Sequence, residues 1–258
     1  MSSLHRIGVI IGHEVRVARR DPLPLMVLVV FPLITIAFLK PALRPALVQS
    51  GHPDANGAEH VVPGQAAMSA FFLVSLITFA FFTEHAWATW DRLRASAATS
   101  FEIVVGKTLP RVALGIAQFA VILVGGVVLF DLNIRGDALA LVPLVIAFSI
   151  CLVLLGVAVT ALCRTAQQAN SFGYLGMVLF GAIGGAFVPF NLLPAWARAI
   201  SPATPTYWAM RGLRAVILDG RGFGAVVRPS VVLVAMTALF AVVALRRMRF
   251  DETKTGWT

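Results

Sequence analysis

The feature that most constrains this chain is a series of six long stretches that contain no Asp, Glu, Lys or Arg. A helix needs about 20 apolar residues to cross the roughly 30 Å of hydrocarbon in a bilayer. A membrane barrel would instead show segments of about ten residues with alternating polarity. The stretches cover residues 23–39, 61–83, 112–130, 138–163, 165–197 and 229–245. The sequence therefore predicts an all-α membrane protein with six transmembrane helices.

The limits of each span follow from the charges and prolines around its stretch. The fifth stretch is too long for one span, so we expect its helix to end near residue 190 and irregular apolar chain to follow. The spans are placed at residues 23–39, 64–83, 110–130, 139–162, 171–190 and 226–245. All six belong to one transmembrane domain that covers residues 1–258.

Composition supports a membrane protein and argues against other classes. Hydrophobic residues make up 59% of the chain and charged residues 13%, whereas soluble domains average about 45–50% and about 25%. Two cysteines in one apolar stretch do not make a disulfide scaffold. The net charge of +9 is interpreted as membrane topology and contact with lipid headgroups. We expect membrane lipids as partners and no nucleic acid.

The basic residues also predict the orientation. Six spans leave both termini on one side of the membrane. The N-terminal segment, the loops after the second and fourth spans and the tail at residues 246–258 together hold 13 Lys and Arg, whereas the other three loops together hold 8. The positive-inside rule therefore favours cytoplasmic termini.

The first 21 residues show the pattern of an amphipathic helix. Apolar residues recur every three or four positions, with basic residues on the opposite face, and Asp21-Pro22 ends the pattern. We expect a helix that lies flat on anionic headgroups on the cytoplasmic side. A frayed basic leader is the alternative.

The loop between the second and third spans, residues 84–107, combines two tryptophans with mixed charges at helical spacing. Thr99 and Glu102 match a capping box, which predicts a helix start. We expect two short helices that form a rigid elbow able to dock into a groove on another protein, the alternative being an ordinary connector. The candidate docking residues are Glu84, Thr89, Asp91, Arg92, Leu93, Arg94, Ser96, Phe101 and Glu102.

The loop before the last span also predicts helices. Residues 192–200 suit a short interfacial helix, and Thr204 caps a second one that begins at Pro205 and is stopped by Asp219-Gly220. We expect a helical hairpin against the outer leaflet, with its arginines reaching lipid phosphates. The alternative is a further partial span.

No catalytic or metal site is evident in the sequence. Gly106-Lys107-Thr108 resembles the end of a phosphate loop, but Phe101 occupies the position of its first glycine. No Asp or Glu lies in the middle of a span, which argues against a proton-coupled carrier. We therefore expect neither a catalytic residue, nor a metal, nor a cofactor in this chain.

Polar and small residues inside the spans are the remaining candidates for a substrate path or for helix packing. Gly181 and Gly185 form a G-x-x-x-G pair, which permits close helix approach. The path candidates are Ser75, Thr78, Phe79, Gln167, Asn170 and Tyr174.

Taken together, the pattern resembles the membrane subunit of an ABC-2 type transporter, the group of bacterial drug exporters similar to the daunorubicin permease. One stretch that carries the likeness contains Glu84, residues 89–96 and Glu102 to Lys107. The other contains residues 188–194, Ile200-Ser-Pro202 and residues 207–214. The resemblance implies that the first stretch is a coupling helix on an ATPase and that the second is a hairpin near the exit.

The resemblance further implies a permease of an ATP-binding cassette exporter in the bacterial cytoplasmic membrane. Its partners would be two separate ATPase subunits, which carry the ATP and magnesium, and a second permease copy or a paralogue. The exported molecule would be hydrophobic or amphipathic, such as a drug, antibiotic, lipid or glycolipid. A membrane enzyme that modifies lipids and a non-transporting scaffold are the alternatives.

Overall fold

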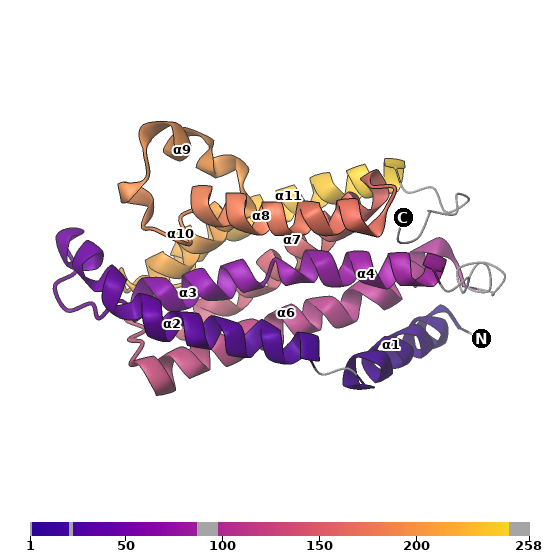
Figure 1. Cartoon of the computed structure of the whole chain (residues 1–258), viewed down its shortest axis with the longest axis horizontal. Coiled ribbons are helices and arrows are strands. Elements are labelled where there is room, and N and C mark those ends of the chain that lie inside the picture. Colours follow the sequence, from indigo (N-terminus) through magenta and orange to yellow (C-terminus); the bar gives the residue numbers. More distant parts are fainter. Residues whose placement is uncertain (1, 21–22, 87–97, 248–258) are drawn as a thin grey trace.

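The structure is a computed structural model that describes residues 2–20, 23–86 and 98–247. The described residues are helical, with turns between the helices and no strand. Figure 1 shows an elongated bundle with one shorter helix beside one end and a group of short helices at the other. Within these ranges, five segments are long and apolar enough to cross a membrane: Met26–Gln49, Ala58–Thr83, Ser100–Phe130, Ala138–Leu162 and Phe223–Arg247.

The first long helix extends past the end expected at residue 39. Helix α2 (Leu23–Gln49) continues through Pro41 and Pro45, so the segment from residue 40 to residue 49 is not a loop. Lys40 holds this extension against the end of another helix, because its Nζ donates to the Phe130 carbonyl over 2.7 Å. The chain then turns and enters the next helix after Gly57, whose φ is +103°.

The second expected span consists of two helices, α3 (Ala58–Ser69) and α4 (Phe72–Ala86). A buried side chain braces the break between them: Gln118 donates from Nε2 to the Ser69 hydroxyl over 2.6 Å and to the Ala66 carbonyl over 3.2 Å. The buried amide nitrogen of Gln118 thus has hydrogen-bond partners that offset its desolvation. The hydrophobic pattern predicted one continuous span because both halves are apolar.

The third long helix begins earlier than expected. Helix α6 (Ser100–Phe130) runs through Pro110, whereas the sequence predicts that the span starts at this proline. Helix α7 (Leu141–Leu162), preceded by the short turn η1 (Ala138–Ala140), lies at the centre. It packs against α4, α6, α10 and α11, and Phe148 on α7 meets Phe119 edge to face at 5.9 Å.

The fifth expected span differs most from its prediction. Helix α8 covers Ala166–Ile183 rather than residues 171–190, and the turn at Gly184 and Gly185 ends it. The polar residues of its first turns explain why it is not among the five candidate spans.

The rest of the chain forms short helices and one long one. These are η2 (Phe190–Leu192), α9 (Ala195–Ile200), η3 (Ser201–Ala203), α10 (Pro205–Ile217) and α11 (Phe223–Arg247). The Thr204 side chain accepts from the Tyr207 amide, as the sequence predicted for the start of α10.

The two ends of the bundle are therefore different. Helix α1 (Ser3–Arg20) and the last turn of α11 lie at one end, and α9 and α10 lie at the other (Figure 1).

Candidate functional site

The start of α6 forms the local structure that its sequence predicts. Thr99 Oγ1 accepts from the Glu102 amide over 3.3 Å, and Glu102 Oε2 accepts from the Thr99 amide over 2.8 Å. This reciprocal pair confirms the capping box. It gives the chain that enters α6 a defined direction.

Of the candidate docking residues, the structure describes the side chains of two. Phe101 is 72% exposed, whereas Glu102 is 2% exposed. The Glu102 carboxylate accepts two hydrogen bonds from Arg6, at 2.8 Å from Nη2 and 3.0 Å from Nε. Glu102 was expected on the docking surface, but the structure uses it to hold α1 against α6.

The other candidate docking residues are not placed. Glu84 lies in the last turn of α4, and its side chain is outside the described part. Thr89, Asp91, Arg92, Leu93, Arg94 and Ser96 also lie outside the described residues.

A second ion-pair cluster joins the same helices and was missed by sequence reasoning. Glu14 on α1 lies between Lys107 and Arg111 of α6, at 2.9 Å from Lys107 Nζ and 2.6 Å from Arg111 Nη2. Lys107 Nζ also donates to the Ala80 carbonyl of α4 over 3.1 Å. One lysine therefore connects three helices: α1, α4 and α6.

The cluster is largely buried, and it places one carboxylate between two cations. The side chains of Glu14 and Lys107 are 7% and 2% exposed. Burial alone would raise the pKa of the Glu14 carboxyl, but the charges of Arg111 and Lys107 and their hydrogen bonds outweigh it, so the pKa lies below its ordinary value. Glu14 is thus ionised at neutral pH.

The sequence carried a signal for this cluster. Glu14 is the only acidic residue among the first 20, and it follows Ile7 by seven positions and Ile10 by four. It therefore lies on the inward face of the helix, where a charge requires a partner. Gly106 completes the contact, because a Cβ there would lie 2.6 Å from Cγ2 of Ile10.

The candidate path residues fall into different environments. Thr78 is fully buried, and its hydroxyl lies 3.1 Å from that of Thr160 on α7. Ser75 lies beside Gly173, where a Cβ would be 2.7 Å from its hydroxyl oxygen. Phe79 and Tyr174 are 49% and 53% exposed. Within this chain, Thr78 therefore contributes to packing and does not line a surface.

The two remaining path candidates and the glycine pair lie on or after α8. Gln167 is exposed and Asn170 is half-buried in its first turns. Gly181 is buried against Met68 of α3. Gly185 lies beyond the end of α8 with a φ of +81°, so it shapes a turn. The expected helix-packing role of Gly185 is wrong, because the helix ends before it.

Comparison with known proteins places these features in a family context. The family model described as ABC-2 type transporter matches residues 5–218. The chain is similar to the linearmycin resistance permease protein LnrN of Bacillus subtilis, with 28% identity over 62% of this chain and 41% of the relative. It is also similar to the probable multidrug ABC transporter permease YbhR of Escherichia coli, with 24% identity over 60% and 42%.

A more distant relative comes from a eukaryote. The ABC transporter G family member 20 of Dictyostelium discoideum is 24% identical over 67% of this chain and 24% of its own length. The aligned region spans about two fifths of the two bacterial relatives and about a quarter of this one.

Proposed function

Because the chain belongs to the ABC-2 type transporter family, we propose that it is the permease subunit of an ATP-binding cassette exporter. It moves a hydrophobic or amphipathic molecule, such as a drug, antibiotic, lipid or glycolipid, out across a bacterial cytoplasmic membrane. The observation that carries the proposal is the family match from residue 5 to residue 218. The relatives named as resistance and multidrug permeases support the substrate class.

The energy for transport comes from two separate ATPase subunits, which bind the ATP and magnesium. The contact with them lies at the end of the bundle where α4 ends and α6 begins, with both termini on the cytoplasmic side. Phe101 supports this assignment, because a side chain that is 72% exposed at a capped helix start offers apolar surface to a partner. The Glu14–Lys107–Arg111 cluster transmits a push on this end to α1, α4 and α6 as one unit.

A second copy of the chain, or a paralogue, completes the transporter. In this arrangement α8 is also a span, the fifth in chain order, which brings their number to six, and the path runs along the exposed parts of α4 and α8. Phe79 and Tyr174 support that position, since both are about half exposed on these two neighbouring helices. The polar first turns of α8 then face the path or the partner copy and avoid the lipid.

The test is co-purification with the ABC ATPase encoded beside this chain's gene. Phe101→Asp places a charge in the proposed contact, and we expect it to reduce the recovered ATPase by about tenfold or more. Phe223→Asp is the matched control, because Phe223 is also an exposed phenylalanine in the first turn of a helix but lies at the other end of the bundle.

Both variants should retain the melting temperature of the parent chain in detergent, since both side chains are exposed. Equal ATPase recovery with Phe101→Asp and the parent chain would refute the contact. Full ATP hydrolysis by the purified chain alone would refute the division into permease and ATPase.

A further inference from the structure

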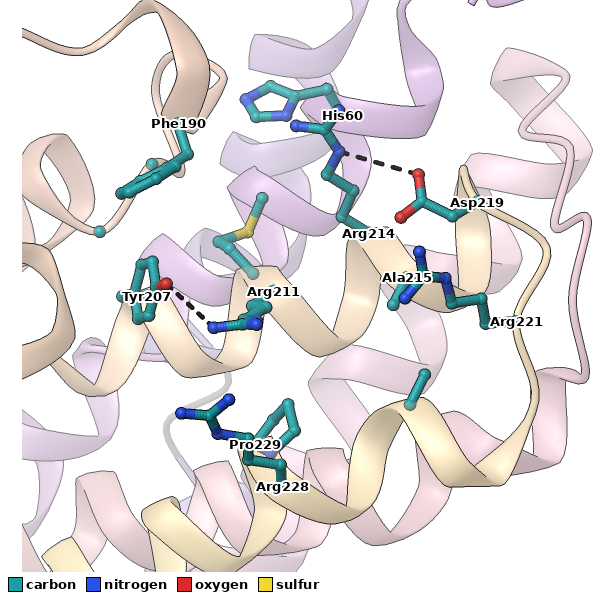
Figure 2. A pocket seen from close by; sticks show the side chains of 14 residues that line it. His60, Phe190, Tyr207, Arg211, Arg214, Ala215, Asp219, Arg221, Arg228 and Pro229 are labelled. Carbon is teal, nitrogen blue, oxygen red and sulfur yellow. Dashed lines mark hydrogen bonds and ion pairs between the residues drawn. The ribbon is translucent and has the colours of Figure 1, made fainter. Parts of the chain in front are cut away.

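A pocket of about 460 Å³ lies between α10, the start of α11 and α3, at the end of the bundle opposite α1. Figure 2 shows that charged side chains from α10, α11 and the turn between them surround it. Among the described residues, four arginines line it, and Asp219 is the one acidic lining residue. The arginines are Arg211, Arg214, Arg221 and Arg228.

The single carboxylate neutralises only part of this charge. Asp219 Oδ1 lies 4.0 Å from Nε of Arg214 and 3.6 Å from Nε2 of His52. Within the described ranges, no carboxylate lies within 4.0 Å of Arg211, Arg221 or Arg228. The pocket therefore carries an excess of positive charge.

Two of these arginines come from different helices and converge on one aromatic ring. The guanidinium carbons of Arg211 and Arg228 lie 5.7 Å and 5.8 Å from the ring centre of Trp208. Arg211 also donates from Nη1 to the Tyr207 hydroxyl over 3.2 Å. Two like charges near one ring repel each other, and an anion in the pocket that both arginines line would offset this repulsion.

An independent observation comes from α3. His60 lines the pocket and is 5% exposed, and its Nε2 is buried with no hydrogen-bond partner in the part of the chain that the structure describes. Native proteins seldom leave such an atom unpaired, because its desolvation is not compensated. A ligand oxygen in the pocket would provide the missing partner.

The remaining wall is apolar. Phe190, Met210 and Pro229 line the pocket beside the charged groups, and the ring of Phe190 lies 5.2 Å from that of Tyr207. A small inorganic anion would leave this wall without contacts. A ligand with an anionic head and an apolar portion would use both sides.

We propose that this pocket binds the phosphate-bearing headgroup of an anionic amphiphile, held by Arg211 and Arg228 with His60 as a further donor and the apolar wall against its chain. The site does not depend on transport or on an ATPase. Binding by the purified chain therefore tests it separately from the proposed function.

The experiment titrates the full chain in neutral detergent with three probes: dihexanoyl phosphatidylglycerol, dihexanoyl phosphatidylcholine and inorganic phosphate. Calorimetry measures affinity and stoichiometry. We expect phosphatidylglycerol to bind at about one molecule per chain. It should bind at least about tenfold more tightly than phosphatidylcholine, which has the same acyl chains but no net charge. Equal affinity for the two lipids would overturn the proposal.

The probes also separate the two sources of a phosphate group. We expect inorganic phosphate to bind more weakly than phosphatidylglycerol, because it lacks the chains that contact the apolar wall. If it binds as tightly and competes with the lipid, the ligand is a soluble phosphate and the proposed amphiphile is wrong.

The variant Arg211→Gln with Arg228→Gln should weaken phosphatidylglycerol binding by about tenfold or more. Arg198→Gln is the matched control, because Arg198 is an exposed arginine of α9 outside the pocket. In the absence of ligand, the double variant should melt at the same temperature as the parent chain or higher, because it removes the repulsion between the two arginines. Unchanged lipid affinity in the double variant, or equal losses in the control, would refute the site.

Discussion

At the scale of single residues, Glu14 has the clearest energetic role. It is a buried carboxylate between two cations, on a helix whose other charges are basic. Such a cluster contributes little net stability when it is complete, because desolvation offsets the attraction. Its loss is costly, because it removes both ion pairs of a cluster in which the Lys107 side chain is 2% exposed.

We expect Glu14→Gln to lower the free energy of unfolding by about 3–5 kcal/mol, since it breaks the ion pairs of Glu14 with Lys107 and Arg111. Melting in detergent measures the change. Glu14→Gln combined with Lys107→Met should recover much of the loss, because the buried ammonium that Glu14 contacts is then gone. Arg16→Gln, at an exposed position of the same helix, should have little effect. A loss in the double variant equal to the sum of the single losses would contradict the coupling.

The stability that Glu14 contributes depends on pH, and the sign of this dependence is defined. The pKa of Glu14 lies below its ordinary value, so the carboxylate stabilises the folded chain fully above the unfolded pKa of about 4.3. The contribution is lost as the pH falls through the lowered pKa of the folded state. The melting difference between the parent and Glu14→Gln should thus stay constant from neutral pH to about pH 5 and shrink in stronger acid.

At the scale of helices, close approach between α4 and α7 organises the bundle. Gly156 on α7 lies against α4, where a Cβ would contact the Ile77 side chain and lie 3.0 Å from Cα of Val74. Backbone atoms cannot move aside as a flexible side chain can. The glycine therefore determines how near these two helices lie.

Gly156→Ala should destabilise the fold by about 1–3 kcal/mol through overpacking, as measured by melting in detergent. Gly224→Ala is the matched control: Gly224 is also helical, but a Cβ there has nothing within 4 Å. We expect that control to be neutral or to stabilise by about 0.5–1 kcal/mol. Equal changes in stability at both positions would show that helix propensity, and not contact with α4, determines the effect of Gly156→Ala.

At the scale of the whole molecule, the two ends of the bundle have distinct chemistry. One end carries α1 with its paired charges, and the other carries α9, α10 and the arginine-lined pocket (Figure 1). In the proposed orientation the first end is cytoplasmic and the second faces outward. The cytoplasmic end then contacts the ATPase, and the outward-facing end binds the headgroup.

Cysteine labelling tests this arrangement. The native Cys151 and Cys163 are buried, so an impermeant thiol reagent should report introduced cysteines. Arg198→Cys should react in intact cells, and Ser3→Cys only after the membrane is opened. The reverse pattern would refute the orientation, and labelling of both from one side would refute the separation of the two ends.

Much of the local structure could be predicted from the sequence because the cause is local. The Thr99–Glu102 capping box and the Thr204 cap involve residues three positions apart, and both form as expected. The break between α3 and α4 could not be predicted, because it depends on Gln118 from a distant helix. The end of α8 depends on Gly184, which must lie close to Thr206 of α10.

In the candidate site, too, some features follow from the sequence and others only from contacts between distant helices. The sequence by itself determined that this is an apolar helical protein of the ABC-2 type transporter family, since composition and motif order are properties of the chain alone. Only the tertiary structure decided that Glu102 binds Arg6, that Glu14 lies between two cations, and that His60 and the arginines share a pocket. These partners lie tens to more than a hundred positions apart. Helical periodicity tells which residues share a face, but only packing determines which faces meet.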